Sequence, residues 1–244
     1  MAGHSKWSNI KNKKGKTDAA RGHIFTKIGR EIAVAVKQGG ADPASNSRLR
    51  DVIVKAKQNN MPNDNINRSI KKASGELDSV NYEEITYEGY AAGGVALIIE
   101  TLTDNRNRTA GEVRHLLDKY GGSLGQTGCV SFLFNRKGVI IAEKGDFSED
   151  DMMMFALEAG ADDIVEDEEV FEIYTLPTDL GNVADKLTEA GVVILSQTVD
   201  MLPENEIDPE GHLESVLKLI DKLEENDDIQ NVYHNAVLPE AEDE

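Results

Sequence analysis

The sequence of 244 residues predicts an α+β multidomain protein, in which an N-terminal three-helix domain precedes two α/β sandwich domains. The third domain is expected to be ferredoxin-like (βαββαβ) and inserted in the second. Three observations lead to this fold: helical apolar spacing through residues 24–75, strand and helix patterns from Tyr82, and a final helix and strand with no partners inside the βαββαβ unit. The predicted domains are 1–80, 81–136 with 206–238, and 137–205, followed by an acidic disordered tail over 239–244.

Three apolar stripes, with steps of three and four residues, predict the helices of the first domain. They comprise Phe25, Ile28, Ile32 and Val36, then Leu49, Val52, Ile53 and Ala56, and then Ile66, Ile70 and Ala73. Gly39-Gly40 ends the first helix, Asp42-Pro43 predicts the start of the second, and Gly75 ends the third. The polar segment from Met1 to Arg21 is expected to stay mobile until it binds a partner.

The second domain begins with two strands, Glu84 to Tyr90 and Val95 to Thr101, which flank Gly93-Gly94 and predict a hairpin. A helix from Arg108 to Tyr120 follows, and a strand from Val130 to Phe134 comes after it. Alternation along this strand places Val130, Phe132 and Phe134 on one face. We therefore expect these side chains to pack in the core rather than to form the aromatic strand of an RNA-recognition domain.

The order of patterns after Gly138 predicts the βαββαβ unit. Its elements are a strand over 139–143, a helix over 148–158, strands over 163–167 and 170–175, a helix over 179–190 and a strand over 192–199. A helix with apolar residues from Leu213 to Leu223 and a strand over 229–234 come next. Because the second domain lacks a closing helix and strand before residue 138, these two elements are predicted to complete its two-layer sandwich.

The charge is distributed very unevenly along the chain. Residues 1–75 hold 16 Lys and Arg against 5 Asp and Glu, whereas residues 76–244 hold 10 against 40, so a segment of +11 precedes a body of −30. Such a basic segment indicates a polyanionic partner, because Lys and Arg that neutralise phosphates supply most non-specific affinity for nucleic acid. The sequence holds neither a membrane-spanning apolar run nor a signal-peptide core, so a cytoplasmic protein with no membrane contact is expected.

No motif in the sequence predicts an enzyme. Gly15-Lys16-Thr17 resembles the end of a phosphate-binding loop, but Ile10 stands where that motif needs glycine. The five histidines are scattered, and Cys129 is more simply a small buried hydrophobe than a nucleophile. The acidic run from Asp162 to Glu169 lacks the spacing of a calcium loop and is expected to be solvated. We therefore expect no catalytic residue, no metal, no cofactor and no small-molecule substrate.

The strongest functional signal is the basic arm, which we define as the segment from Met1 to Arg21. Its predicted nucleic-acid-binding residues are Lys6, Trp7, Lys11, Lys13, Lys14, Lys16 and Arg21. Clustered charges can engage phosphates together, and Trp7 offers a surface for base stacking. Basic residues on the second and third helices extend the positive potential: Arg48, Arg50, Lys55, Lys57, Arg68, Lys71 and Lys72. The alternative is a solvated surface that serves solubility.

Two further features bear on nucleic-acid contact. The short turn between the second and third helices suggests a helix-turn-helix that reads bases in a major groove. However, Pro62 lies in the turn, and no set of base-reading side chains stands out on the third helix. Non-specific contact with nucleic acid is therefore at least as well supported as base reading. Arg106 and Arg108 lie at a helix start in the acidic part of the chain. They are predicted either to make a second phosphate contact or to take part in capping that helix.

Three longer motifs resemble those of the YebC family. They are Ala2-Gly3-His4-Ser5-Lys6-Trp7-Ser8-Asn9-Ile10-Lys11, Tyr87-Glu88-Gly89-Tyr90 with Thr103 to Thr109, and Gly121-Gly122-Ser123-Leu124-Gly125. The resemblance extends from Ala2 to about Ala236. It implies a cytoplasmic protein of three domains, the third inserted in the second, and it assigns no catalytic residues.

The resemblance leaves the nucleic acid open. Members of the YebC family are described as DNA-binding transcriptional regulators, and their organellar relatives as translational activators. The sequence therefore predicts either a regulator that contacts duplex DNA or a translation factor that contacts ribosomal RNA, with its acidic domains facing basic ribosomal proteins. A protein-interaction scaffold that binds no nucleic acid is a third hypothesis, and in it the lysines of the arm contribute to no binding.

Overall fold

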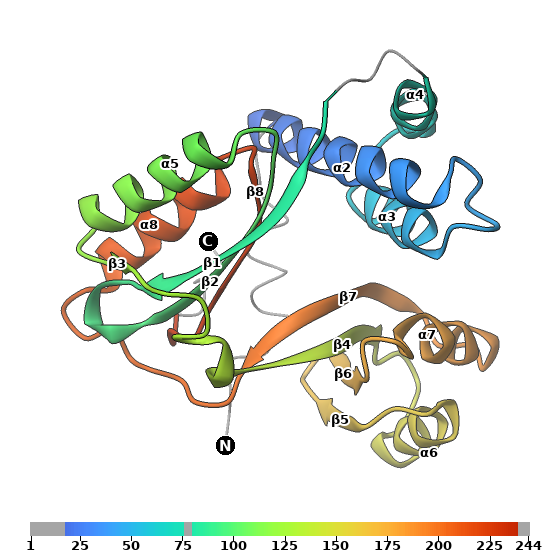
Figure 1. Cartoon of the computed structure of the whole chain (residues 1–244). Helices are drawn as coiled ribbons and strands as arrows, with labels where there is room; N and C mark the ends of the chain where they lie inside the picture. The colour runs from blue at the N-terminus through green and yellow to red at the C-terminus, as the bar shows by residue number, and fades with distance from the viewer. Residues whose placement is uncertain (1–17, 76–79, 239–244) are drawn as a thin grey trace. The chain divides into compact units, whose positions relative to one another are not determined.

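A computed structural model of the chain describes residues 18–75 and 80–238 (Figure 1). These residues form two compact units. Residues 134–204 make up one unit, and the other combines the residues that precede it with residues 205–237. The first of these units is therefore a single continuous segment inserted into the second, as the sequence predicts. No helix within the described ranges is both long and apolar enough to cross a membrane.

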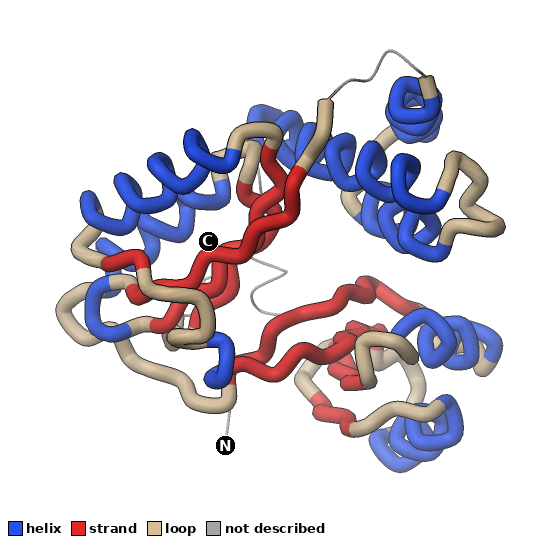
Figure 2. The backbone as a smooth tube through the Cα atoms, viewed as in Figure 1, coloured by secondary structure: helices blue, strands red, loops and turns tan. Residues whose placement is uncertain are grey.

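Three helices form the N-terminal region: α2 (Asp18–Gly39), α3 (Ser47–Gln58) and α4 (Asn63–Ser74). Both α3 and α4 pack against α2 (Figures 1 and 2). Their apolar stripes meet in one core, whose buried residues include Ile28, Ile32, Leu49, Ala56 and Ile66. The predicted three-helix region is confirmed, and its stripes are buried because each helix presents its apolar positions to the other helices.

Two predicted boundaries in this region are wrong. The first helix begins at Asp18, so residues 18–21 of the basic arm are helical, while the rest of the arm lies outside the described residues. The second helix begins at Ser47, because Asn46 rather than Asp42 is its N-cap and accepts the Leu49 N–H at 3.0 Å. The Asn46 amide also donates to the carbonyl of Ala35 at 2.8 Å, which ties the cap to α2.

The second region is an antiparallel sheet covered by helices. Its strands, β1 (Glu83–Tyr90), β2 (Ala96–Thr103), β3 (Ser123–Leu124) and β8 (Ile229–His234), lie in the order β3-β1-β2-β8. Helices α5 (Arg106–Lys119) and α8 (Leu213–Glu224) pack side by side on the sheet (Figure 1). A short 3-10 helix, η1 (Ala92–Gly94), joins β1 to β2. The predicted hairpin is confirmed, and α8 and β8 complete the two-layer sandwich.

The predicted strand from Val130 to Phe134 is wrong. Residues Ser131–Leu133 form a 3-10 helix, η2, and the next strand begins at Phe134. The buried Glu88 carboxylate accepts the backbone N–H groups of Gly128, Val130 and Ser131 at 2.8–2.9 Å, and this holds the segment in a loop. Val130 and Phe134 are buried as expected, but Phe132 is 67% exposed, so its predicted place in the core is also wrong.

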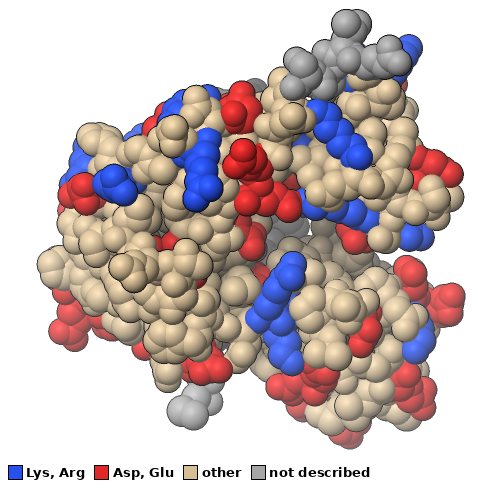
Figure 3. Space-filling view, in the orientation of Figure 1, with Lys and Arg blue, Asp and Glu red and all other residues tan. Residues whose placement is uncertain are grey.

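The inserted unit is ferredoxin-like, as predicted. Its elements are β4 (Phe134–Glu143), α6 (Glu149–Ala159), β5 (Asp163–Glu166), β6 (Val170–Thr175), α7 (Leu180–Glu189) and β7 (Ile194–Pro203). All pairs are antiparallel, and the strand order is β5-β6-β4-β7. Both helices pack on one face of the sheet around Ile140, Met152 and Phe171. Acidic side chains gather on the face of this unit that is visible in Figure 3.

Candidate nucleic-acid interface

The predicted site residues fall into two groups. Six residues of the basic arm lie outside the described residues: Lys6, Trp7, Lys11, Lys13, Lys14 and Lys16. The other three are Arg21, exposed near the start of α2, and Arg106 and Arg108, both in the first turn of α5. The structure therefore leaves the arm as a prediction and describes the helical surface that continues from it.

Basic residues of α2 are engaged by the adjacent sheet region. The Lys27 ammonium donates to the carbonyl of Glu224 at 2.5 Å, at the C-terminus of α8, where carbonyl groups lack helical partners. Arg30 donates to the Asp227 carbonyl at 2.8 Å and to the Asp228 carboxylate at 2.5 Å. Lys37 donates to the carbonyl of Val80. These cations therefore hold α2 in place.

Asp228 is the centre of a buried polar cluster. Its carboxylate accepts hydrogen bonds from Arg30, from Arg108 at 2.7 Å, and from the hydroxyls of Thr103 and Thr109 at 3.0 and 2.7 Å. Burial by itself disfavours the charged form, but the hydrogen bonds from Arg108, Thr109 and Arg30 outweigh it and lower the pKa of Asp228 to about 2. Asp228 therefore stays ionised between two guanidinium groups.

The two arginines at the start of α5 differ in their contacts. Asn105 caps the helix by accepting the Arg108 N–H at 3.1 Å, and the Arg108 side chain donates to Asp104 and Asp228. The hydrogen bonds to Asp228 and Asp104 raise the pKa of Arg108 above its ordinary value. Arg106 is exposed and forms no hydrogen bond or ion pair with another described residue. Of the two, only Arg106 has a charge that is not paired with a described acid.

Helices α3 and α4 carry some basic residues that are paired with acids and others that are not paired with any described residue. Arg48 pairs with Glu84, and Lys55 pairs with Glu31 at 2.6 Å. Five others are exposed and form no hydrogen bond or ion pair with any residue that the structure describes: Arg50, Lys57, Arg68, Lys71 and Lys72. Figure 3 shows basic side chains on the visible face of this helical region. We call these five residues the free cations of α3 and α4.

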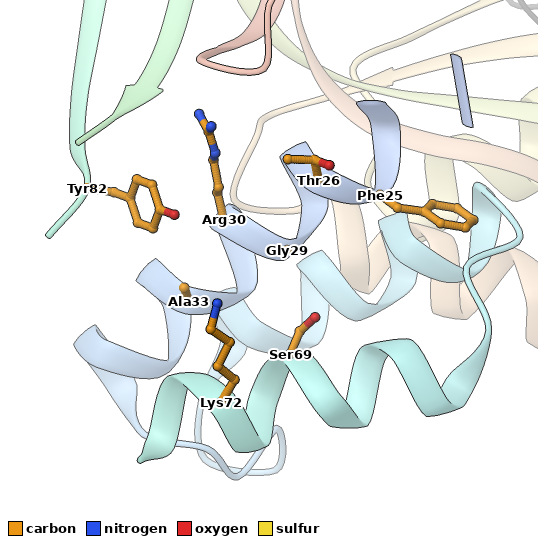
Figure 4. Close-up of a pocket in the computed structure, with 8 residues that line it drawn as sticks. All are labelled: Phe25, Thr26, Gly29, Arg30, Ala33, Ser69, Lys72 and Tyr82. Atoms are coloured by element: carbon orange, nitrogen blue, oxygen red, sulfur yellow. The ribbon is translucent and has the colours of Figure 1, made fainter. Parts of the chain in front are cut away.

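A pocket of about 360 Å³ lies between α2, α4 and the segment before β1 (Figure 4). Its lining residues are Phe25, Thr26, Gly29, Arg30, Ala33, Ser69, Lys72 and Tyr82. Ser69 and Lys72 point from α4 toward α2 in this view. The Arg30 guanidinium lies over the Tyr82 ring, 5.6 Å from its centroid. The pocket is therefore a mixed polar and aromatic site that includes one of the free cations.

The described residues offer little for metal or nucleophilic chemistry. They contain no group of three or more His, Cys, Asp and Glu placed to hold a metal ion. Cys129 is only partly buried, contrary to the prediction, and its desolvation and the nearby Glu88 carboxylate raise the pKa of its thiol, which disfavours the thiolate. In the acidic run, Asp162 and Glu166 pair with Lys137 and Lys144 at 2.6 and 2.5 Å. These features are explained by the fold alone.

Sequence reasoning missed the Asp228 cluster and the pocket. Asp228 lies in an acidic stretch, and nothing in its neighbours singles it out. A weak signal for the pocket was present: Gly29 lies within a strong helical pattern, where glycine is less favourable than alanine by about 1 kcal/mol. Without the partner helix, that signal could not indicate which residues surround the glycine.

Comparison with known proteins assigns the family. A model described as the TACO1/YebC protein N-terminal domain matches residues 5–76, and one described as the TACO1/YebC second and third domain matches residues 82–236. The chain belongs to the TACO1/YebC family. The resemblance to the YebC family that the motifs indicate is therefore confirmed over nearly the whole chain.

Relatives of this TACO1/YebC protein carry a functional name. A protein of Acetivibrio thermocellus is 62% identical over 239 residues, which cover 96% of this chain and 98% of that protein. A protein of Clostridium tetani is 57% identical over 242 residues, which cover 98% of each. Both are named probable transcriptional regulatory proteins, and these names support a regulatory role. Neither name denotes an enzyme.

A solved structure supports the architecture. The crystal structure of a conserved hypothetical protein of Aquifex aeolicus matches with a TM-score of 0.83 and 47% sequence identity. The match covers 97% of this chain and 98% of that chain. The two chains thus share the arrangement of a helical region followed by α/β domains.

Proposed function

We propose that this TACO1/YebC protein is a DNA-binding regulator of transcription, which holds the phosphate backbone through the basic arm and the free cations of α3 and α4. The names of its relatives support regulation, and the free cations are the observation that supports a nucleic-acid partner. Phosphate contacts by Lys and Arg position a protein on DNA and supply affinity that does not depend on sequence. Localisation in the cytoplasm and the absence of catalysis belong to the same proposal.

The free cations support a nucleic-acid partner because none of them forms a hydrogen bond or an ion pair with a described residue. A cation that is paired inside the fold must break that pair before it can neutralise a phosphate, whereas an exposed and unpaired one releases counterions from the nucleic acid at no such cost. Residues 134–204 contribute the opposite potential, with 18 Asp and Glu against 4 Lys and Arg. Repulsion between this unit and phosphates leaves the helical region and the arm as the surface that meets nucleic acid.

Fluorescence anisotropy with labelled duplex DNA tests the proposal. Four free cations outside the pocket, Arg50, Lys57, Arg68 and Lys71, are replaced together by alanine. Each lost phosphate contact lowers the magnitude of the slope of log affinity against log salt by about 0.9, so a decrease of roughly 3.6 is expected for the four residues. The control replaces Lys218 and Lys222, which are exposed on α8 and paired with Glu214 and Glu225, and its affinity should stay within about twofold.

A triple alanine variant of Lys13, Lys14 and Lys16 tests the arm separately. Loss of binding in this variant excludes the scaffold hypothesis, in which these lysines contribute to no binding. Footprinting tests promoter recognition: if excess protein protects no discrete site and affinity is indifferent to DNA sequence, recognition of promoters is wrong.

The alternative is a translation factor that places the same surface on ribosomal RNA, and the acidity of residues 134–204 favours it. Such a unit complements basic ribosomal proteins while the cationic surface contacts RNA. Sedimentation of cell lysate through sucrose gradients separates the two functions. Co-sedimentation with ribosomes at low and moderate salt supports the translation factor, and absence from ribosomal fractions contradicts it.

A further inference from the structure

We propose that the pocket between α2 and α4 binds one phosphate group of the nucleic-acid backbone, with Lys72 and Ser69 as its ligands. This inference rests on the proposed function and refines it. It distinguishes a defined phosphate site from the diffuse attraction that any exposed cation exerts.

The charge balance of the pocket favours an anion. None of the eight lining residues is acidic, and two of them, Arg30 and Lys72, are basic. The charge of Arg30 is balanced by Asp228, to which it is directly bonded. Lys72 is exposed and has no ion pair among the described residues, so no described acid balances its charge. Among the residues that the structure describes, Lys72 therefore gives the pocket an unpaired positive charge.

The hydrogen-bonding groups also fit a phosphate. Ser69 lies one helical turn before Lys72, and residues three apart share a face of a helix. Its hydroxyl forms no hydrogen bond with a described residue and is available to donate. The Thr26 hydroxyl, across the pocket on α2, already donates to the Gly22 carbonyl at 3.0 Å. Ser69 and Lys72 are thus two donors on α4 that a phosphate oxygen can use.

Gly29 lines the pocket from α2 and places no side chain in it. A Cβ atom at this position would lie 3.8 Å from the Ser69 hydroxyl oxygen, in the space in front of that donor. Its backbone is helical, and a glycine in a helix interior is less favourable than alanine by about 1 kcal/mol, so helix propensity does not explain this residue. With glycine at this position, the space in front of the Ser69 hydroxyl stays open.

The lining of the pocket favours a phosphate carried by a strand over a free ion. A pocket of about 360 Å³ has room for a phosphate together with part of the group that carries it. It lies at the lower end of the volumes that hold small organic ligands. The rings of Phe25 and Tyr82 line the same pocket and suit the sugar next to the phosphate. We therefore commit to a backbone phosphate within a strand.

The test compares neighbouring residues on α4. Lys71 and Lys72 are both exposed and unpaired among the described residues, but only Lys72 lines the pocket. A bound phosphate predicts that Lys72→Ala weakens oligonucleotide binding about tenfold and Ser69→Ala about threefold. The matched controls lie on the same helix: Lys71→Ala should lose only the affinity of one diffuse phosphate contact, less than Lys72→Ala loses, and Ser74→Ala should lose none. Thermal unfolding of each variant verifies that the fold is retained.

The outcomes separate this inference from the proposed function. If the unmodified protein binds the oligonucleotide and Lys72→Ala behaves like Lys71→Ala, the pocket is not a phosphate site, while the proposed function stands. If the unmodified protein binds neither DNA nor RNA at low salt, the proposed function fails and the inference fails with it.

A second measurement identifies the source of the phosphate. Amide resonances of Gly29 and Ser69 are followed by NMR during titration with the oligonucleotide and, separately, with inorganic phosphate at matched ionic strength. Shifts that saturate with the oligonucleotide and remain small with inorganic phosphate support a backbone phosphate. Shifts produced by inorganic phosphate alone overturn the assignment, because they describe a site for a free anion.

Discussion

Helices α2 and α4 carry similar numbers of basic residues but use them differently. On α2, Lys27, Arg30 and Lys37 donate to carbonyl or carboxylate oxygens of the sheet region and its approach. On α4, Arg68, Lys71 and Lys72 reach solvent and pair with no described residue. The number of cations in a segment therefore does not show how many can meet a ligand. The packing of the helix that carries them decides this.

The difference follows from what each helix contacts. The α2 helix packs against α3 and α4 and also lies against the C-terminal end of α8, where unsatisfied carbonyls and Asp228 attract cations. The α4 helix buries only one stripe, which includes Ile66 and Ala73, and its opposite face has no neighbour among the described elements that supplies an acid. Substitutions should therefore change stability on the first surface and binding on the second.

The largest effect on stability is expected from Asp228→Ala. This variant leaves the guanidinium groups of Arg30 and Arg108 and two threonine hydroxyls without their shared acceptor. Removing one partner of a buried ion pair leaves the other charge uncompensated and costs about 3–5 kcal/mol. Because Arg108 is 42% exposed and water can solvate it, we expect the lower value, a loss of about 3 kcal/mol in the free energy of unfolding. Urea denaturation monitored by circular dichroism measures it.

Glu214→Ala is the control for this variant. Glu214 also pairs with a lysine, but at an exposed position on α8, and its removal should change the free energy of unfolding by less than about 0.5 kcal/mol. Equal losses in the two variants would show that the Asp228 cluster does not hold α2 in place.

A decrease in pH should weaken the same cluster. The pKa of Asp228 is about 2 in the folded protein and has an ordinary value of 3.8, so the unfolded chain takes up its proton first as the pH falls. The stabilisation is therefore complete above about pH 4 and is lost as the pH falls toward 2, and it amounts to about 2 kcal/mol. The free energy of unfolding of Asp228→Asn should fall less steeply over this window than that of the unmodified protein.

The parts of the fold that could be predicted from the sequence are those determined by residues close together in the chain. The apolar stripes predicted α2 to α4 and the βαββαβ unit, because periodicity is a local property. The start of α3 was wrong because Asp42 and Asn46 are both good N-caps, and a hydrogen bond from Asn46 to Ala35 favours the second. The loop around Val130 was wrong because its acceptor, Glu88, lies 42 residues earlier.

In the candidate site, contacts between residues far apart in the sequence limited the prediction even more. The sequence placed basic residues in the helical region, but it could not separate Arg30 from Lys72, because the partner of Arg30 lies 198 residues away. The pairing of Arg108 with Asp228, 120 residues apart, was hidden for the same reason. Which cations are free is therefore a property of the tertiary structure, whereas the basic character of the region is a property of composition.

A smaller change in stability is expected from Arg30→Gln. The amide retains a donor near Asp228 but removes a guanidinium that is 18% exposed, while Arg108 continues to balance the carboxylate. We expect a loss of about 1–2 kcal/mol in the free energy of unfolding. The charge of Arg30 is already paired with Asp228. The slope of log affinity against log salt should therefore change by no more than about 0.3, whereas the loss of a full phosphate contact changes it by about 0.9. A decrease near 0.9 in anisotropy titrations would contradict the division between the two helices.

The smallest change in stability is expected where the effect on binding is large. Replacing Arg68, Lys71 and Lys72 together by alanine removes three exposed cations that pair with no described residue and introduces a better helix former at each position. The free energy of unfolding should change by no more than about 0.5 kcal/mol, while the salt slope for oligonucleotide binding falls by roughly 2.7. Destabilisation of more than about 2 kcal/mol in urea titrations would mean that α4 uses its cations to fold, as α2 does, and the contrast between the two helices would be lost.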